Sequence, residues 1–153
     1  MQALELKVPP PVVLLVIAAA MWAVSLAGPS LGLREPHGIV VAGAIAAVGA
    51  GIDLFSVISF LLAKTTINPM KPDRTTALVT SGAYRFSRNP MYVGLVIVLL
   101  AWAVFLNSAW SLVGPFVFVL YINRLQIVPE ERVLAAAFGP AYAAYKSSVR
   151  RWL

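Results

Sequence analysis

The sequence has no cysteine and only one histidine among its 153 residues. The lack of cysteine excludes disulfides and thiolate metal ligands, and a single histidine excludes the histidine clusters typical of zinc sites. Charge is also scarce, because only 12% of the residues are Asp, Glu, Lys or Arg. We therefore expect no metal site, and we expect lipid rather than water to surround most of the chain.

Apolar residues take the place of the missing charges: they make up 60% of the chain, and the mean hydropathy is +0.84. A bilayer core needs about 20 apolar residues per helix, and four segments qualify, residues 12–33, 38–63, 90–106 and 109–126. The last two are separated only by Asn107 and Ser108, so they should form an antiparallel helical hairpin. The expected fold class is therefore all-α, an integral membrane protein with four transmembrane helices.

We expect residues 1–153 to form a single domain with two parts. Residues 1–63 supply two N-terminal spans, and residues 64–153 supply a long loop, the hairpin and short cytosolic C-terminal helices. With four spans, eleven of the twelve Lys and Arg residues lie on one side and only Arg34 lies on the other. Because cytoplasmic loops carry the excess of Lys and Arg, both termini are expected in the cytoplasm, with the protein in the bacterial cytoplasmic (inner) membrane.

The net charge of +6 thus indicates topology and attraction to the anionic headgroups of the lipid bilayer. No nucleic acid partner is expected, because no basic face with interleaved aromatic residues lies outside the membrane flanks. Within the spans, Asp53 stands out, since an acid there costs about 2.5 to 3.5 kcal/mol on insertion scales. Two interpretations of Asp53 stay open: it pairs with a polar side chain inside the bundle, or it lines a substrate pocket.

Polar residues gather in two blocks of the second half, residues 64–94 and 129–153. In the first block, Asn89 and Pro90 predict a helix start, because Asn suits the N-cap and Pro suits the first helical position. In the second, Pro129 predicts another helix start, and Gly139 with Pro140 predicts the end of that helix and the beginning of the next. Since a hairpin joins the blocks, both should return to the cytoplasmic face.

Taken singly, these residues have structural interpretations: arginines anchor topology, and acids complement a helix dipole. Together they offer separate places for an anion and a cation. A helix N-terminus beside Arg88 attracts a carboxylate, whereas Glu130 and Glu131 attract an ammonium or a sulfonium. Tyr84 or Tyr92 is available for cation–π contact. An amino-acid-like zwitterion fits this description, and S-adenosylmethionine is one.

The strings LVTSGAYRFSRNPMYVGL and PEERVLAAAFGPAYAAY resemble the isoprenylcysteine carboxyl methyltransferase family and its relatives, the phospholipid N-methyltransferases. The specific likeness covers about residues 64–153. It implies a membrane methyltransferase that uses S-adenosylmethionine without a Rossmann domain, in agreement with the absence of a G-x-G-x-x-G motif. By the same resemblance, the cofactor-binding residues are Thr76, Ala77, Leu78, Val79, Tyr84, Arg88, Asn89, Pro90, Met91, Tyr92, Glu130 and Glu131.

The resemblance assigns no catalytic residue, because in-line methyl transfer needs mainly alignment of the reactants and exclusion of water. We expect a polar cofactor pocket at the cytosolic surface and an apolar passage from the bilayer for a hydrophobic small-molecule or lipid acceptor. Two departures from the pattern of the family leave the identity of that acceptor open. Asn89 stands where the eukaryotic enzymes commonly have a titratable His, and Gln126 and Ile127 stand where those enzymes place a substrate-binding Arg.

Two alternative functions also stay open. An NADPH-dependent membrane reductase of the sterol-reductase kind has a similar arginine-rich loop, but the acidic pair disfavours its additional phosphates. A non-catalytic lipid-binding membrane protein would account for the four spans and the charges by topology alone. It would not account for two polar blocks that both carry the strings of one family.

Overall fold

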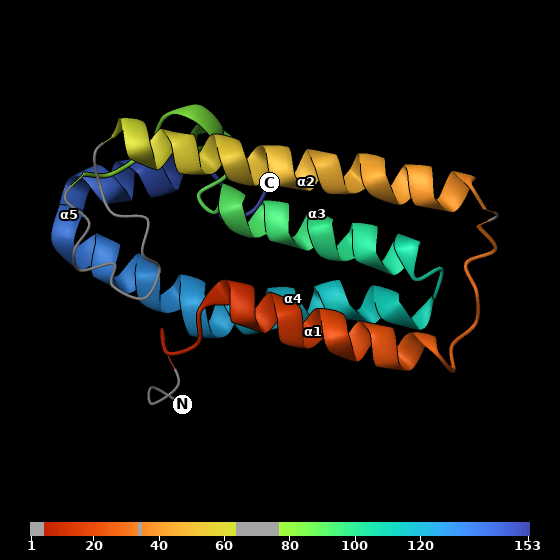
Figure 1. Ribbon diagram of the computed structural model, residues 1–153. Helices are drawn as coiled ribbons and strands as arrows, with labels where there is room; N and C mark the ends of the chain where they lie inside the picture. Colours follow the sequence, from red (N-terminus) through yellow and green to blue (C-terminus); the bar gives the residue numbers. More distant parts are fainter. Residues whose placement is uncertain (1–4, 34, 64–76) are drawn as a thin grey trace.

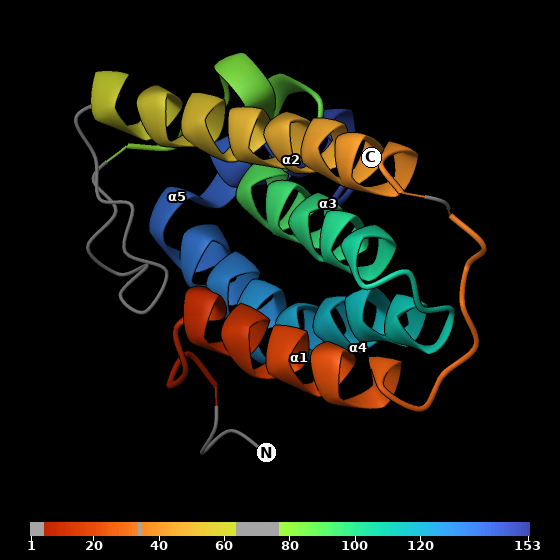
Figure 2. The same ribbon diagram turned by 45° about the vertical axis from the view of Figure 1, so that its right-hand side comes forward.

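The computed structural model describes residues 5–33, 35–63 and 77–153. Its regular elements in these ranges are all helical, as expected. The longer ones are α1 (Pro10–Ser25), α2 (His37–Leu62), α3 (Pro90–Phe105), α4 (Val113–Ile122) and α5 (Val128–Ser148). Three short ones, η3 (Gly82–Arg85), η4 (Trp110–Leu112) and the π-helical turn η5 (Asn123–Ile127), connect them. The bundle pairs α2 with α3 and α1 with α4, and α5 continues α4 beyond it (Figures 1 and 2).

Large apolar side chains cover the outside of this bundle. Side chains that are between 62% and 73% exposed occur on α1, α2 and α4, among them Leu15, Val40, Leu54, Phe116 and Leu120. Among the described residues, α2 and the helical run from Trp110 to Ser148, which is kinked at Gly139, are long and apolar enough to cross a membrane. Helices α1 and α3 are apolar but have 16 residues each. An apolar exterior of this extent indicates contact with lipid. The protein is therefore membrane-associated.

The first helix is shorter than the sequence predicted, because the expected span of residues 12–33 ends as α1 at Ser25. Pro29 cannot continue a helix, since it has no N–H group. The segment that follows instead binds the turn between α3 and α4. The Leu31 N–H donates to the Asn107 carbonyl at 3.0 Å, and the Ala109 N–H donates to the Pro29 carbonyl at 2.9 Å.

The turn between α3 and α4 makes the predicted antiparallel hairpin (Figure 1). Asn107 adopts φ 48°, a left-handed conformation that Asn tolerates better than most residues. Its side-chain amide also donates to the Leu33 carbonyl at 3.2 Å. The hairpin returns the chain to the end of the bundle where α3 begins.

The predicted helix start at Pro129 is confirmed, because α5 begins at Val128 with Pro129 in its first turn. No break precedes this start, however, since the π-helical turn η5 joins α5 directly to α4. Proline cannot donate to the carbonyl four residues earlier, which here belongs to Leu125. That carbonyl instead accepts a hydrogen bond from the Leu6 N–H at 3.1 Å. The turn before the proline widens into η5, where the Val128 N–H bonds to the Asn123 carbonyl five residues back.

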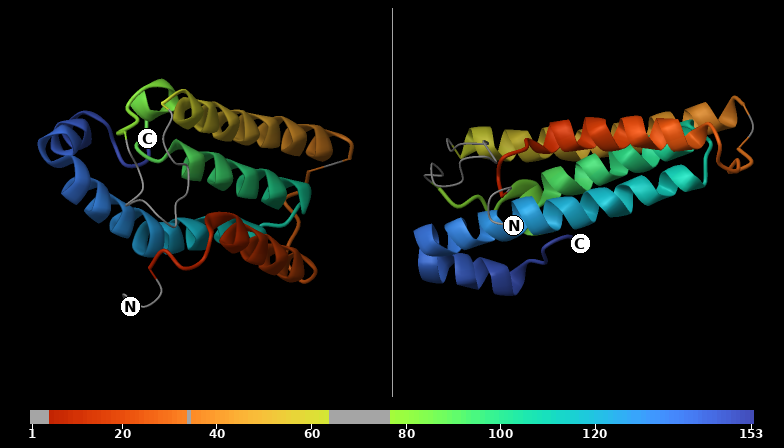
Figure 3. Two further views of the ribbon diagram at one scale, coloured as in Figure 1. Left: turned by 60° about the vertical axis from the view of Figure 1, so that its left-hand side comes forward. Right: turned by 90° about the horizontal axis from the view of Figure 1, so that it is seen from below.

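The predicted break at Gly139 and Pro140 is confirmed. Gly139 adopts φ 48° and ψ −121°, a left-handed conformation that favours glycine, and Pro140 follows it. The resulting kink turns the second half of α5 back, so that the end of the chain lies beside the start of α3 (Figures 1 and 3). The kink therefore brings the second polar block onto the first.

Helices α2 and α3 approach each other most closely at two glycines. A Cβ atom at Gly49 would lie 2.8 Å from the Gly94 carbonyl oxygen and 3.0 Å from a methyl group of Val98. Small residues permit such close helix contacts in membrane proteins. This contact fixes α2 against the first turns of α3, where the predicted site residues begin.

We predict that Gly49→Ala destabilises the fold by about 1 to 3 kcal/mol, because the added methyl group forces two helix backbones apart. Gly43→Ala is the matched control on the same helix, since a Cβ atom there meets nothing within 4 Å. Thermal unfolding of the purified proteins in detergent measures both effects. Equal melting temperatures for the two variants would contradict the proposed close contact.

Candidate functional site

The two polar blocks meet where α3 begins and α5 leaves the bundle (Figures 1 and 3). The last residues of the chain run along the segment before α3. The Arg88 N–H donates to the Arg150 carbonyl at 2.9 Å, and the Asn89 side-chain amide donates to the Arg151 carbonyl at 2.9 Å. Residues more than sixty positions apart in the sequence thus form one surface at this end of the molecule.

Glu131 is the centre of this surface. Its Oε1 accepts hydrogen bonds from Arg88 Nη2 at 2.8 Å and from Arg151 Nε at 3.0 Å, while its Oε2 accepts from Arg151 Nη2 at 2.7 Å. Burial raises the pKa of Glu131, but the hydrogen bonds and charges of Arg151 and Arg88 outweigh that effect and hold the pKa below its usual value. Glu131 is therefore an ionised carboxylate that is already neutralised by two arginines.

Glu130 lies beside Glu131 but in a different environment. Both glutamates follow the predicted span of residues 109–126. Glu130 Oε1 accepts hydrogen bonds from the Tyr92 hydroxyl at 2.8 Å and from the Gln126 amide at 2.9 Å, and no ion pair involves Glu130 among the described residues. Burial raises the pKa of Glu130 to about 7, although both hydrogen bonds lower it. Glu130 therefore has only neutral donors, and its charge is available to a cation.

Three tyrosines complete the polar surface. The Tyr145 hydroxyl donates to the Tyr84 carbonyl at 2.7 Å, and the Tyr142 ring packs edge-on against Tyr145. All three side chains are buried. Burial raises the pKa of Tyr84 well above its usual value, and the neighbouring Tyr145, Glu130 and Asp53 raise it further. Tyr84 therefore stays neutral and lies close to two carboxyl groups.

The structure brings together most of the predicted site residues that it describes. Tyr84, Arg88, Asn89, Tyr92, Glu130 and Glu131 all belong to the contacts above or lie beside them. Before η3, Ala77 and Leu78 are half-buried and Val79 is buried. In the first turn of α3, Pro90 is buried and Met91 is half-buried. Thr76 lies outside the described residues.

One local prediction needs correction, and two residues were missed. Asn89 occupies the N-cap position of α3, but its side chain caps no helix N–H, because it donates to the Arg151 carbonyl instead. Gln126 and Arg151, which bond the two glutamates, were not among the predicted site residues. The pairing of Gln126 with Glu130 was visible as a spacing of four residues on a helix, whereas nothing in the sequence placed Arg151 against Glu131.

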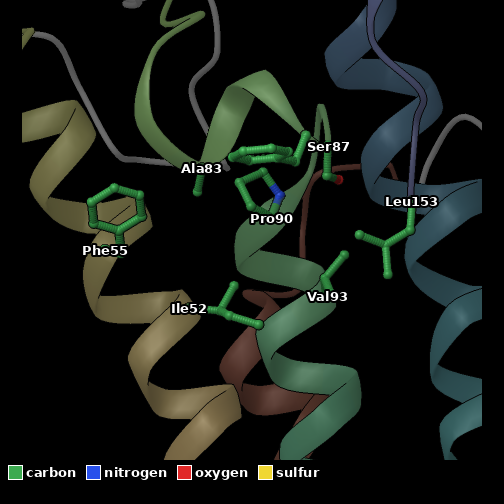
Figure 4. A pocket seen from close by; sticks show the side chains of 8 residues that line it. Ile52, Phe55, Ala83, Ser87, Pro90, Val93 and Leu153 are labelled. Atoms are coloured by element: carbon green, nitrogen blue, oxygen red, sulfur yellow. The ribbon is translucent and has the colours of Figure 1, made fainter.

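An apolar cavity of about 260 Å³ lies between α2, the start of α3 and the end of the chain (Figure 4). Ile52 and Phe55 approach it from α2, Pro90 and Val93 approach it from α3, and Leu153 lines it from the end of the chain. Ala83, Phe86 and Ser87 complete the lining. Of the predicted site residues only Pro90 contributes, so the cavity offers a surface for hydrocarbon rather than for a charged ligand.

The fold and the site define a class of protein: an all-helical membrane protein with paired acidic and basic groups at one end of an apolar bundle. The chain belongs to the phospholipid methyltransferase family, whose model matches residues 38–141. This match confirms the family of membrane methyltransferases that the two strings indicated. Membership indicates a methyltransferase that acts on lipids, and such a reaction requires a methyl donor.

A curated relative is an uncharacterized protein of Haemophilus influenzae, which is 44% identical over 63 residues. That stretch covers 41% of this chain and 100% of the relative. No solved structure matches the chain.

We predict that Glu131→Gln destabilises the protein by about 1 to 3 kcal/mol at neutral pH, because charge-assisted hydrogen bonds to two arginines are lost. The folded pKa of Glu131 is lowered, so its contribution is complete above the usual Glu pKa of about 4.3 and disappears as the pH falls below it. The difference in melting temperature between wild type and variant should therefore narrow on acidification.

Glu5→Gln is the matched control, since Glu5 pairs at 3.4 Å with Arg132, whose side chain is 57% exposed. Such surface pairs contribute about 0 to 1 kcal/mol. A pH-independent difference for Glu131→Gln, or an equal loss for both variants, would contradict the role assigned to Glu131.

Proposed function

We propose that this protein transfers a methyl group from S-adenosylmethionine to a hydrophobic or membrane-resident acceptor. The donor binds at the cytosolic ends of α3 and α5, and the acceptor enters from the bilayer. The observation that carries this proposal is the contrast between the two neighbouring glutamates: Glu131 is neutralised by arginines, whereas Glu130 has no cationic partner among the residues that the structure describes. When bound, S-adenosylmethionine supplies a methyl group made electrophilic by a positively charged sulfur.

The donors and acceptors of the site fit such a zwitterion at both ends. Arg88 Nε is buried without a hydrogen-bond partner, so a donor is available for a carboxylate. The Glu130 carboxylate is available for the cationic end, and the ring of Tyr92, whose hydroxyl donates to Glu130, lies beside it. In this assignment Glu130 contacts the ligand directly, while Glu131 positions Arg88 and Arg151.

The residues of the site also supply the conditions that methyl transfer needs. Tyr92, Tyr142, Tyr145 and Gln126 are buried, so they limit the access of water to the carboxyl groups. Alignment of two reactants in such a place can supply up to about 7 to 11 kcal/mol in well-oriented cases. The apolar exterior of α2 and the cavity in Figure 4 suit the hydrocarbon part of an acceptor.

We predict that Glu130→Gln weakens S-adenosylmethionine binding by about 10- to 100-fold, from the loss of about 1.5 to 3 kcal/mol of charge-assisted hydrogen bonding. A bound cation favours the ionised form of Glu130, whose pKa is about 7. The affinity of the wild type should therefore rise between about pH 6 and pH 8, and this rise should be weaker in Glu130→Gln.

Isothermal titration calorimetry on the detergent-purified protein measures both effects, and Arg132→Gln is the control, since Arg132 is exposed and follows the acidic pair. NADPH, titrated in parallel, tests the reductase alternative. Tight binding of NADPH with no binding of S-adenosylmethionine would overturn the proposal, and binding of neither ligand would favour a non-catalytic lipid-binding protein.

The proposed topology has four spans, with the site and both termini on the cytoplasmic side. Because the chain has no cysteine, single cysteines can be placed without background. Ser147→Cys should react with a membrane-impermeant maleimide only after the cells are opened, whereas Glu35→Cys should react in intact spheroplasts. Reaction of both from the same side would exclude this topology while leaving the binding site untouched.

A further inference from the structure

Asp53 is a half-buried acid that none of the contacts above uses. It lies in the C-terminal half of α2, and its carboxyl group packs against the backbone of α3, since a Cβ atom at Gly94 would overlap Asp53 Oδ1. Oδ1 is buried and has no hydrogen-bond partner. The sequence left open that Asp53 pairs with a polar side chain inside the bundle. This atom has no such partner.

Asp53 lies on the face of α2 that turns toward the candidate site. Phe60 is seven residues further along α2, which places it on the same face, and its ring packs edge-on against Tyr84 with the ring centres 5.2 Å apart. Tyr84 in turn lies close to Glu130 as well as to Asp53. The neighbouring residues Ile52 and Phe55 line the apolar cavity of Figure 4.

The groups that face Asp53 are neutral. Gly94 belongs to α3 and Tyr84 to η3, and among the described residues no Arg or Lys forms an ion pair with Asp53. An unpaired acid inside a span destabilises the folded protein and marks a functional position by default. A ligand group that donates a hydrogen bond would satisfy Asp53 Oδ1, whereas a carboxylate would bring a second acid to the same place.

We propose that Asp53 is a catalytic residue that accepts a hydrogen bond, and then the proton, from the atom that becomes methylated. The acceptor is therefore an amine, a hydroxyl or a thiol. In the balanced step the acceptor atom bonds to the methyl carbon, the carbon–sulfur bond of the donor breaks with its electron pair left on sulfur, and the acceptor's proton passes to Asp53. This inference rests on the proposed function, since it assigns the acceptor side of the same site.

Four probes with one hydrocarbon chain test the inference: dodecylamine, dodecanol, dodecanethiol and dodecanoate, each with labelled S-adenosylmethionine and protein in lipid nanodiscs. At least one of the first three should be methylated in preference to dodecanoate. Asp53→Asn should lower that turnover by about 100-fold or more, the usual size of a general-base contribution, with unchanged affinity for S-adenosylmethionine. Asp53→Glu, which keeps a carboxyl group, should recover part of the turnover.

A binding measurement gives a readout independent of turnover. The preferred probe should raise the melting temperature of the wild type and of the control Ser56→Ala, whose hydroxyl bonds within its own helix to the Ile52 carbonyl, but not that of Asp53→Asn. Preference for dodecanoate, or equal turnover and equal stabilisation for wild type and Asp53→Asn, would overturn the inference while S-adenosylmethionine still binds. Failure of the wild type to bind S-adenosylmethionine would instead overturn the proposed function.

Discussion

Both oxygens of the Glu131 carboxylate receive hydrogen bonds from arginines, and those two arginines come from opposite ends of the C-terminal half of the chain. Arg88 precedes α3, Arg151 follows α5, and Glu131 joins them at the point where the hairpin closes. Each of these charges would be costly to bury alone. Because they are paired, the start of α3, the first turn of α5 and the end of the chain form a single structural unit.

Within the described part of the chain, that unit pairs no cation with Glu130, although Glu130 is adjacent to Glu131 in sequence. Consecutive helical residues differ by about 100° in direction, so one acid faces the arginines and the other faces Tyr92 and Gln126. Two identical side chains thereby differ in charge state, with the pKa of one lowered and that of the other raised to about 7. A structural acid and an acid available to a ligand can lie side by side in this way.

Much of this arrangement could be predicted because it follows from helix length and hairpin geometry. The short Asn107–Ser108 connection requires α3 and α4 to be antiparallel, and this alone brings Tyr92 near Glu130. The partners of Arg151 and Asn89 could not be predicted, because they depend on how far the Gly139 kink turns the chain back. Pro29 indicated that α1 would end early, but the predicted span was extended to residue 33 because the sequence stays largely apolar beyond the proline.

The π-helical turn before Pro129 accommodates one residue more than a regular helix would, and it lies between the apolar span and the acidic pair. A chain one residue shorter there would keep the same hydrophobic length and the same charges. It would nevertheless rotate everything beyond the turn by about 100°, and other side chains would face α3. Insertion or loss of a single residue in this turn is thus a means by which related membrane proteins could exchange one ligand-facing surface for another without altering how they sit in the bilayer.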